Sequence, residues 1–538
     1  MTKLNTLIIG IITMSLFSCS EKENEDTPWK DYPSIFNHIN ANINSIGKLT
    51  ENGNELPDED RRFEDGSLRW VSGGMDGAFG HLGGENQKII DEVAELTKKI
   101  STGGKLSDKI ALYNIVVEDN LMDFIDPTLE KIVELNIYPD PYLHSWAKWL
   151  AFESPDRGAV KFGIALLGLI RDKNDLDKLK ILGKHEEFTL YVAVAISNTL
   201  ENAEEHLWEL AKYVDGWGRI HLVERLSETN DPNIKHWMIT EGYKNTIMYE
   251  YLALICAVTG DLKFELLKAN PSPEIIQAAG EIIGALISGG PAEDINSYKD
   301  AGDVVKLYLE HSLGKDNSLN QFLILNSIKN YASNQETNWN ELSSNGWTDD
   351  LRANLLIDLH KELSDPKWFN IVNKKLNTTD DREFWEVDKA AEILGIDMWD
   401  VHWKRLNENP TESTLWYNVM KLANNGRIDL ILNLATEKIP LNQISTGAQD
   451  NLGLGEEYKL HSCIDFIIQD LDKYPGKGEK LILASLKSPV TRNRNMAIKA
   501  LTAWGKEWIK KEIKLAIIGA EKVETNIETK KNLQELLK

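Results

Sequence analysis

Cysteine is scarce in this sequence, with only three in 538 residues. A disulfide framework needs more cysteines than that, so packing alone must hold the fold together. Cys256 and Cys463 lie in the apolar runs LALICAV and HSCIDFII, which predict buried and unreactive thiols.

Basic residues are also in deficit, because 60 Lys and Arg stand against 84 Asp and Glu, a formal net charge of -24. An acidic excess of this size repels phosphate backbones and anionic lipid head groups. We therefore expect no nucleic-acid partner. The other proportions are ordinary, with 42% hydrophobic and 27% charged residues, and they exclude an intrinsically disordered or multi-span membrane chain.

The N-terminus carries a short apolar run from Leu7 to Phe17, preceded by the basic Lys3. A run of this length is too short to span a bilayer, and with its basic flank it predicts a signal peptide at residues 1–18. The next residues, LFSC ending at Cys19, resemble the lipobox of bacterial lipoproteins. The resemblance implies that Cys19 becomes the lipidated N-terminus, and two or three acyl chains would hold the protein durably at a membrane. An uncleaved anchor and an ordinary secretory signal are the alternatives.

An acidic tether, residues 19–28, follows the lipobox and contains the run SEKENED. Its polarity predicts a solvated linker. An acidic run at this position also resembles the surface-export signal of some Gram-negative lipoproteins. We therefore expect an outer-membrane lipoprotein of the cell envelope that contacts the membrane through its lipid anchor only, facing either the periplasm or the cell exterior.

From about residue 29 onward the dominant pattern is helical, with apolar positions recurring at intervals of three and four. It is clear over Glu85 to Ile100, Asp303 to Leu313, Asp349 to Leu363 and Lys510 to Leu537, which are separated by short Gly, Pro or Asn/Asp breaks. Strand-like alternation is scarce. The pattern predicts an all-α fold, as one extended helical array.

A string near the C-terminus, SPVTRNRNMAIKALTAWG, resembles the second helix of a HEAT repeat. In that family a proline or acidic turn opens the helix, a basic residue points outward, and small residues let the neighbouring helix approach. The resemblance implies an outward Arg494 and close packing at Ala497 and Ala500. Related strings begin at Pro273 and Val387.

The closing aliphatic positions of these strings are Leu200, Ile283, Leu394 and Leu501, which lie 83, 111 and 107 residues apart. These spacings divide into two, three and three units of about 36 to 42 residues, near the period of HEAT and armadillo repeats. We therefore expect an α-solenoid of HEAT-like helical hairpins, an ARM-type superhelix, over residues 110–538. Residues 29–109 are expected to form an N-terminal cap with a glycine-rich loop.

The glycine-rich loop, residues 65–84, is the first candidate site, with seven glycines that let the backbone approach a ligand closely. It carries the polar side chains Asp65, Arg69, Asp76 and His81. It does not match a Rossmann or Walker loop, because no strand precedes it and no Gly-Lys-Ser/Thr follows. The alternative is a cap over the first repeat.

The second candidate is the segment from Trp217 to Arg225. If a helix begins after Gly218, His221 and Glu224 or Arg225 share one face, while Ile220, Val223 and Leu226 form an apolar arc. A His–carboxylate pair can perform acid/base chemistry, but the remaining ligands of a zinc site are missing. The alternative is a structural network between adjacent repeats. The candidate ligand or partner contacts are therefore Asp65, Arg69, Trp70, Asp76, His81, Trp217, Arg219, His221, Glu224 and Arg225.

The same segment, with residues 245–260 (NTIMYEYLALICAVTG), resembles bacterial helical-repeat proteins catalogued as limonene hydroxylases. The sequence contains neither the cysteine ligand that a haem mono-oxygenase needs in a glycine-framed loop nor a dinucleotide fold, so we expect no cofactor and do not transfer that activity.

Two functions remain. The first is a binding module or scaffold for an envelope protein or a polysaccharide. The second is an enzyme with a site near residues 65–84 or 217–225. A HEAT-class DNA glycosylase is a third hypothesis. The expected export of the chain and its negative net charge argue against it.

Overall fold

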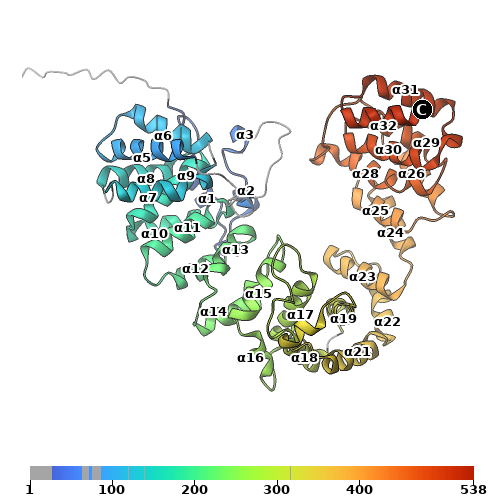
Figure 1. The fold of residues 1–538 in the computed structure, drawn as a ribbon, viewed down its shortest axis with the longest axis horizontal. Helices are drawn as coiled ribbons and strands as arrows, with labels where there is room; N and C mark the ends of the chain where they lie inside the picture. The colour runs from blue at the N-terminus through green and yellow to red at the C-terminus, as the bar shows by residue number, and fades with distance from the viewer. Residues whose placement is uncertain (1–26, 63–71, 75–85, 119, 138–139, 316) are drawn as a thin grey trace, which may run out of the picture. The chain divides into compact units, whose positions relative to one another are not determined.

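The computed structural model describes residues 27–62, 72–74, 86–118, 120–137, 140–315 and 317–538 (Figure 1). Within them the chain is all-α, and its only β pairing consists of two isolated bridges, Ile43 with Leu49 and Asn451 with Val490. The predicted all-α class is therefore confirmed. The predictions for Cys19, Asp65, Arg69, Trp70, Asp76 and His81 fall outside the described residues.

The chain divides into two compact units. The N-terminal unit comprises Met1–Lys315 and Ser327–Asp358, and the C-terminal unit comprises Asp316–Asn326 and Leu359–Lys538, so the division falls within two helices. These two helices are α19 (Leu319–Ala332) and α21 (Asp349–Leu363). The predicted repeat array, residues 110–538, is thus shared between two units, and its predicted start lies inside a helix, α6 (Leu106–Glu118).

The other helices of the N-terminal unit are α1 (Ile35–Ala41), α2 (Glu51–Asn54), α3 (Glu59–Arg62), α5 (Gln87–Ser101), α6 (Leu106–Glu118), α7 (Ile125–Glu134), α8 (Pro141–Glu153), α9 (Arg157–Ile170), α10 (Leu176–Leu182), α11 (Glu186–Thr199), α12 (Glu204–Ala211), α13 (Gly216–Arg225), α14 (Pro232–Trp237), α15 (Glu250–Thr259), α16 (Leu262–Leu267), α17 (Pro273–Ser288), α18 (Ala301–Ser312) and α20 (Trp339–Leu342). Those of the C-terminal unit are α22 (Lys367–Lys375), α23 (Asp381–Leu394), α24 (Trp399–Glu408), α25 (Ser413–Lys421), α26 (Ile428–Lys438), α27 (Leu441–Ile444), α28 (Lys459–Ile468), α29 (Glu479–Ser485), α30 (Thr491–Trp504), α31 (Lys511–Val523) and α32 (Ile527–Leu537).

Several helices begin at an acid or serine followed by proline. Asp140, Asp231 and Ser272 cap α8, α14 and α17, and each side chain accepts a backbone N–H of the first turn. Proline is favoured directly after such a cap because it has no N–H to leave unpaired and its φ already suits a helix. These local signals explain why the breaks in the sequence pattern coincide with helix ends.

The helices of the N-terminal unit pack in series. Helix α8 packs on α9, α9 on α11, α11 on α13, α13 on α15, and α15 on α17. Figure 1 shows α5 to α13 as successive tiers of this unit. The approach of α9 to α11 is close at Gly168, where an added Cβ would lie 2.8 Å from the Ala195 Cα, so glycine is required there.

The repeat spacing differs from the prediction in this region. Between Leu200 and Ile283 the sequence pattern predicts two units, but the chain forms six helical segments there, α12 to α17. Helices α9, α11, α13 and α15 begin at residues 157, 186, 216 and 250, which is 29 to 34 residues apart. The helices between these starts are short, since α10, α12 and α14 have seven, eight and six residues.

The C-terminal unit contains the HEAT-like string, which forms α30. Ala497 and Ala500 are fully buried, in agreement with the expected close packing. Arg494, expected to point outward, is instead fully buried. Its guanidinium forms a 2.7 Å ion pair with Glu524 beyond α31, a partner that the string itself does not contain.

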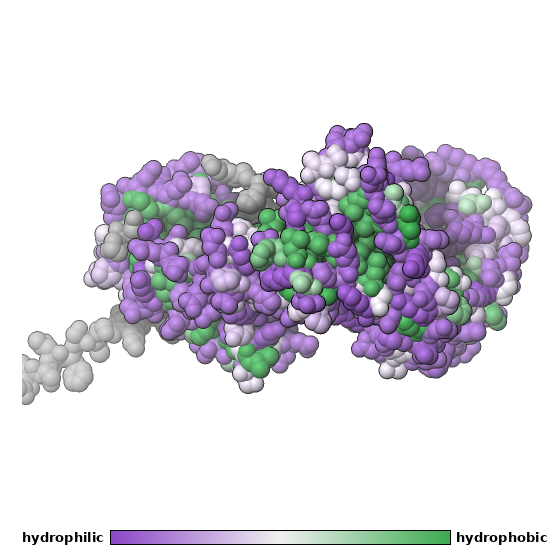
Figure 2. Space-filling view, turned by 90° about the horizontal axis from the view of Figure 1, so that it is seen from below, coloured by the Kyte–Doolittle hydropathy of each residue, from purple (hydrophilic) through white to green (hydrophobic). Residues whose placement is uncertain are grey.

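Cys256 and Cys463 are both free and fully buried, as predicted, and burial raises the pKa of each thiol, to about 12 for Cys463. In the part of the chain that the structure describes, no helix combines the length and hydrophobicity needed to cross a bilayer. Figure 2 shows one face, where hydrophilic residues predominate and hydrophobic residues form scattered patches.

Candidate functional site

A cavity of about 560 Å³ opens in the N-terminal unit where α7, α9, α11, α13 and α15 each contribute side chains. This volume lies within the range of roughly 300 to 1,000 Å³ that is usual for ligand sites. The cavity is lined by Met122, Ile125, Asp126, Leu129, Ala165, Gly168, Leu190, Tyr191, Val194, Ala195, Asn198, Trp217, Ile220, His221, Glu224, Arg225 and Tyr251.

Helix α13 supplies four of the five candidate residues predicted in this segment, Trp217, His221, Glu224 and Arg225. His221 Nδ1 lies 3.8 Å from Glu224 Oε2, and Arg225 Nη1 donates to the His221 carbonyl oxygen at 2.9 Å. The expected shared face is therefore present. The expected apolar arc is also present, since Ile220, Val223 and Leu226 are buried.

Arg219, the fifth candidate, does not line the cavity. Its guanidinium is buried and donates to the carbonyl oxygens of Val214 at 2.8 Å, Lys244 at 2.9 Å and Glu241 at 3.4 Å. These bonds tie the start of α13 to the connection before α15. Arg219 therefore stabilises the backbone at this junction.

Beside Trp217, the cavity is lined by two aromatic side chains that the sequence analysis did not name, Tyr191 and Tyr251. The Trp217 ring lies 5.3 Å from the Tyr251 ring on α15 and 6.5 Å from the His221 ring. Tyr191 of α11 completes this wall. Tyr251 lies in the string NTIMYEYLALICAVTG, but nothing in that string shows which helix its ring faces, because helix pairing is a tertiary property.

The start of α13 is fixed by a carboxylate from the neighbouring helix. The Trp217 N–H donates to Glu186 Oε2 at 3.1 Å, and Asp215 caps Gly216 N. Gly216 has φ +57°, and an added Cβ would lie 1.9 Å from Glu186 Oε2, so only glycine fits. Burial and the neighbouring Asp215 and Glu187 charges raise the pKa of Glu186 to about 7, although the Trp217 N–H opposes this.

The glycine-rich segment reaches the same place. Gly73 N donates to Glu187 Oε2 at 3.0 Å, which sets residues 72–74 against the first turn of α11. The structure therefore brings one described part of the glycine-rich loop beside the helix that positions Trp217. Whether the loop's polar side chains reach the cavity concerns residues outside the described part of the chain.

A buried charge network underlies this junction. Lys161 Nζ lies 2.6 Å from Glu187 Oε1, and Arg157 Nη1 lies 4.0 Å from Glu187 Oε2. Arg157 also binds Asp58 at 2.8 Å and forms a close ion pair with Glu59. The two cations hold the pKa of Glu187 well below its usual range, against the opposing effect of its burial, so this carboxylate stays ionised.

His185 caps α11 in its neutral form. Its Nδ1 accepts the Glu187 N–H at 3.2 Å, so its proton lies on Nε2, 3.3 Å from the Asn54 carbonyl oxygen. Burial lowers the pKa of His185 to about 4. The histidine therefore contributes no charge to the network near neutral pH.

The cavity combines a His–carboxylate neighbour pair with apolar and aromatic walls. The 3.8 Å separation of His221 and Glu224 exceeds hydrogen-bond distance, so the carboxylate does not orient the imidazole as a general base requires. The apolar and aromatic walls can instead bury a ring or aliphatic group of a partner. The charged side chains of Asp126, Glu224 and Arg225 surround that apolar surface.

Comparison with known proteins does not identify the chain. No family model matches it, and no curated protein or solved structure matches it either. Its function must therefore be inferred from its own residues.

Proposed function

We propose that this chain is a lipid-anchored helical-repeat protein of the cell envelope that binds an envelope protein or a surface polysaccharide. In this proposal the helices form an α-solenoid of HEAT-like hairpins, and the glycine-rich segment caps it. The serial packing of α8, α9, α11, α13, α15 and α17 supports the solenoid. The contact of Gly73 with Glu187 supports the cap.

One observation carries the binding function: five alternate helices along the chain, from α7 to α15, all contribute to a single cavity. A repeat array builds its binding surface in this way, by presenting equivalent faces of successive units. Three of the lining side chains are aromatic, Trp217, Tyr191 and Tyr251. Large rigid rings bind a partner with little loss of conformational entropy. We therefore propose that the cavity holds one anchor side chain of a protein partner or one sugar ring of a polysaccharide.

Photo-crosslinking in the native envelope tests this proposal. A photoreactive amino acid at Val194 would stand in the cavity, and one at Val258 would be a matched control, because Val258 is the same residue type on the exposed side of α15 and lies outside the cavity. We expect one discrete adduct from position 194 and none from position 258. Trp217→Ala should abolish the adduct without lowering the melting temperature of the protein by more than a few degrees. Identical adducts from both positions, or none from position 194, would refute the binding site.

The anchor is tested separately with Cys19→Ala. We expect the wild-type chain in the membrane fraction, labelled by a fatty-acid analogue, and the variant in the soluble fraction without label. A variant that fractionates and labels like the wild type would refute lipidation at Cys19, while leaving the cavity assignment standing.

The enzyme hypothesis remains as a second candidate because His221 and Glu224 both line the cavity. It predicts that the species captured at position 194 is a small molecule that the purified protein converts. That conversion should be lost in both His221→Gln and Glu224→Gln. Capture of an unaltered protein or polysaccharide would favour the binding module.

A further inference from the structure

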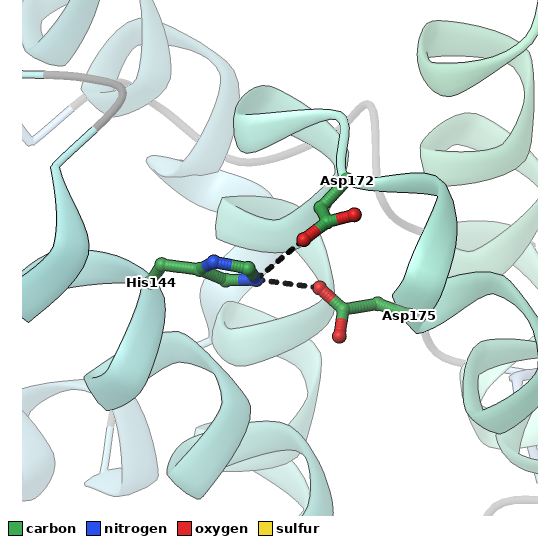
Figure 3. Close-up of side chains that lie close together, drawn as sticks. All are labelled: His144, Asp172 and Asp175. Atoms are coloured by element: carbon green, nitrogen blue, oxygen red, sulfur yellow. Dashed lines mark hydrogen bonds and ion pairs between the residues drawn. The ribbon is translucent and has the colours of Figure 1, made fainter.

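Three side chains of metal-ligand type meet in the N-terminal unit outside the cavity (Figure 3). His144 belongs to the first turn of α8, Asp172 precedes the 3₁₀ turn Lys173–Asp175, and Asp175 ends that turn. His144 Nε2 lies 2.6 Å from Asp175 Oδ2 and 3.9 Å from Asp172 Oδ2. One ligand atom from each residue lies within 4.8 Å of the other two.

We propose that His144, Asp172 and Asp175 bind a divalent transition-metal ion, with Zn²⁺ as the best fit. One imidazole nitrogen and two carboxylate oxygens form a ligand set that zinc accepts, with water in the fourth position. Zinc–ligand bonds of about 2.0 to 2.2 Å in a tetrahedron place the ligand atoms roughly 3.3 to 3.5 Å apart. The observed 2.6 and 3.9 Å lie on either side of this spacing, so small side-chain rotations would complete the site.

The carboxylate of Asp172 is already oriented for this role. Its Oδ1 accepts hydrogen bonds from Asn174 N at 2.9 Å and Asn174 Nδ2 at 2.8 Å, which leaves Oδ2 directed at His144. Fixing one oxygen by bonds from outside the metal sphere orients the other, and such outer bonds raise metal affinity. His144 is likewise positioned by the first turn of α8, which Asp140 caps.

Charge and access also suit a cation. The two carboxylates supply two negative charges, which one divalent ion neutralises. The side chain of Asp175 is 8% exposed, whereas those of His144 and Asp172 are 19% and 33% exposed. The site is therefore anchored on a buried oxygen and open to solvent on its other side, as a site that keeps a water ligand requires.

A second His–Asp pair shows what the third ligand adds. In the C-terminal unit His402 Nε2 lies 2.7 Å from Asp388 Oδ1, almost the same separation as between His144 and Asp175. Across the described part of the chain, only the His144 cluster brings three metal-ligand side chains together. The His402 pair is therefore an internal control that has the same pair chemistry and no third carboxylate.

The test uses the full chain, freed of metal with a chelator and titrated with ZnCl₂ by calorimetry. Asp172→Asn removes one metal-binding charge but keeps the oxygen that accepts the Asn174 hydrogen bonds, so the local fold should persist. We expect one Zn²⁺ per chain for the wild type and at least a tenfold weaker affinity for Asp172→Asn and His144→Gln. His402→Gln should bind like the wild type.

Cobalt gives an independent readout, because Co²⁺ bound by protein ligands in a tetrahedral site absorbs visible light strongly. We expect this absorption in the wild type and in His402→Gln, and its loss in His144→Gln. The proposal is overturned if the wild type binds neither ion, or if the binding survives unchanged in both Asp172→Asn and His144→Gln. Circular dichroism of each variant will show that a loss of binding is not a loss of fold.

Discussion

Each compact unit contains a buried arginine paired with carboxylates, and the two arginines differ in how their surroundings are completed. In the C-terminal unit, Nε and Nη2 of Arg494 each donate to one oxygen of Glu524 at 2.7 Å. Nη1 donates to the carbonyl oxygens of Ser488 and Pro489. Both charged side chains are essentially inaccessible, at 1% and 0% exposed. This pair is closed and structural.

In the N-terminal unit the corresponding arginine, Arg157, begins a longer network. It binds Asp58 and Glu59 and approaches Glu187, which in turn binds Lys161 and the Gly73 N–H. The network ends beside Glu186, whose pKa lies near neutrality. The closed pair of Arg494 and Glu524 therefore stabilises the core around it. The open network beside the cavity instead makes the stability of the N-terminal unit depend on pH.

The largest expected effect comes from breaking the closed pair. Arg494→Met leaves Glu524 buried and uncompensated, which should lower the free energy of unfolding of the C-terminal unit by about 3 to 5 kcal/mol. Urea unfolding, detected by proteolysis of the transiently unfolded chain, measures this free energy of unfolding for each unit. The double variant Arg494→Met, Glu524→Met should recover most of the loss, because neither charge is then left unpaired. A double variant as unstable as the single one would show that the loss does not come from leaving Glu524 unpaired.

A smaller effect is expected where the N-terminal network meets α13. Gly216→Ala places a Cβ against Glu186 at positive φ, and we expect a loss of about 2 to 3 kcal/mol from strain and displaced contacts. Gly395→Ala is the matched control in the C-terminal unit, because Gly395 has a similar φ of +70° but no atom within 4 Å of the added Cβ. Its cost should be only the roughly 1 to 2 kcal/mol of the left-handed conformation.

In a Glu186→Ala background the cost of Gly216→Ala should fall to that of Gly395→Ala, since the atom that the Cβ meets is then absent. Equal losses for Gly216→Ala and Gly395→Ala would mean that Glu186 moves freely. The start of α13 would then not be fixed by the network.

Local signals in the sequence predict much of this architecture. The bounds of α21, Asp349–Leu363, follow from its helical periodicity, and the neighbourhood of His221 and Glu224 follows from their spacing on one helix.

What the sequence could not supply is the partner of each helix. Tyr251 reaches the cavity from α15 and Ile125 from α7, and no periodicity relates either one to Trp217. Arg494 was expected to point outward because the HEAT pattern describes a single helix. Its partner Glu524 lies 30 residues further along the chain, outside that helix. The spacing was overestimated because all five helices from α12 to α16 have no more than ten residues and the pattern does not count turns.

The smallest effect is a pH dependence confined to the N-terminal unit. The pKa of Glu186 is about 7 in the folded chain, above its ordinary 4.5, so its stabilising contribution is complete below pH 4.5 and is lost as pH rises through 7. The pKa of His185 is about 4, below its ordinary 6.5, so its contribution is complete above pH 6.5 and is lost as pH falls through 4. The two contributions oppose each other between pH 5 and 6.5, and above pH 6.5 that of Glu186 dominates. We expect the N-terminal unit to be about 0.5 kcal/mol less stable at pH 8 than at pH 6.5, and Glu186→Gln to remove this loss. The C-terminal transition, measured in the same urea titration, should not change with the substitution.

A pH dependence that survives in Glu186→Gln would assign that dependence to another group. The contrast between the open network and the closed pair would then not depend on Glu186.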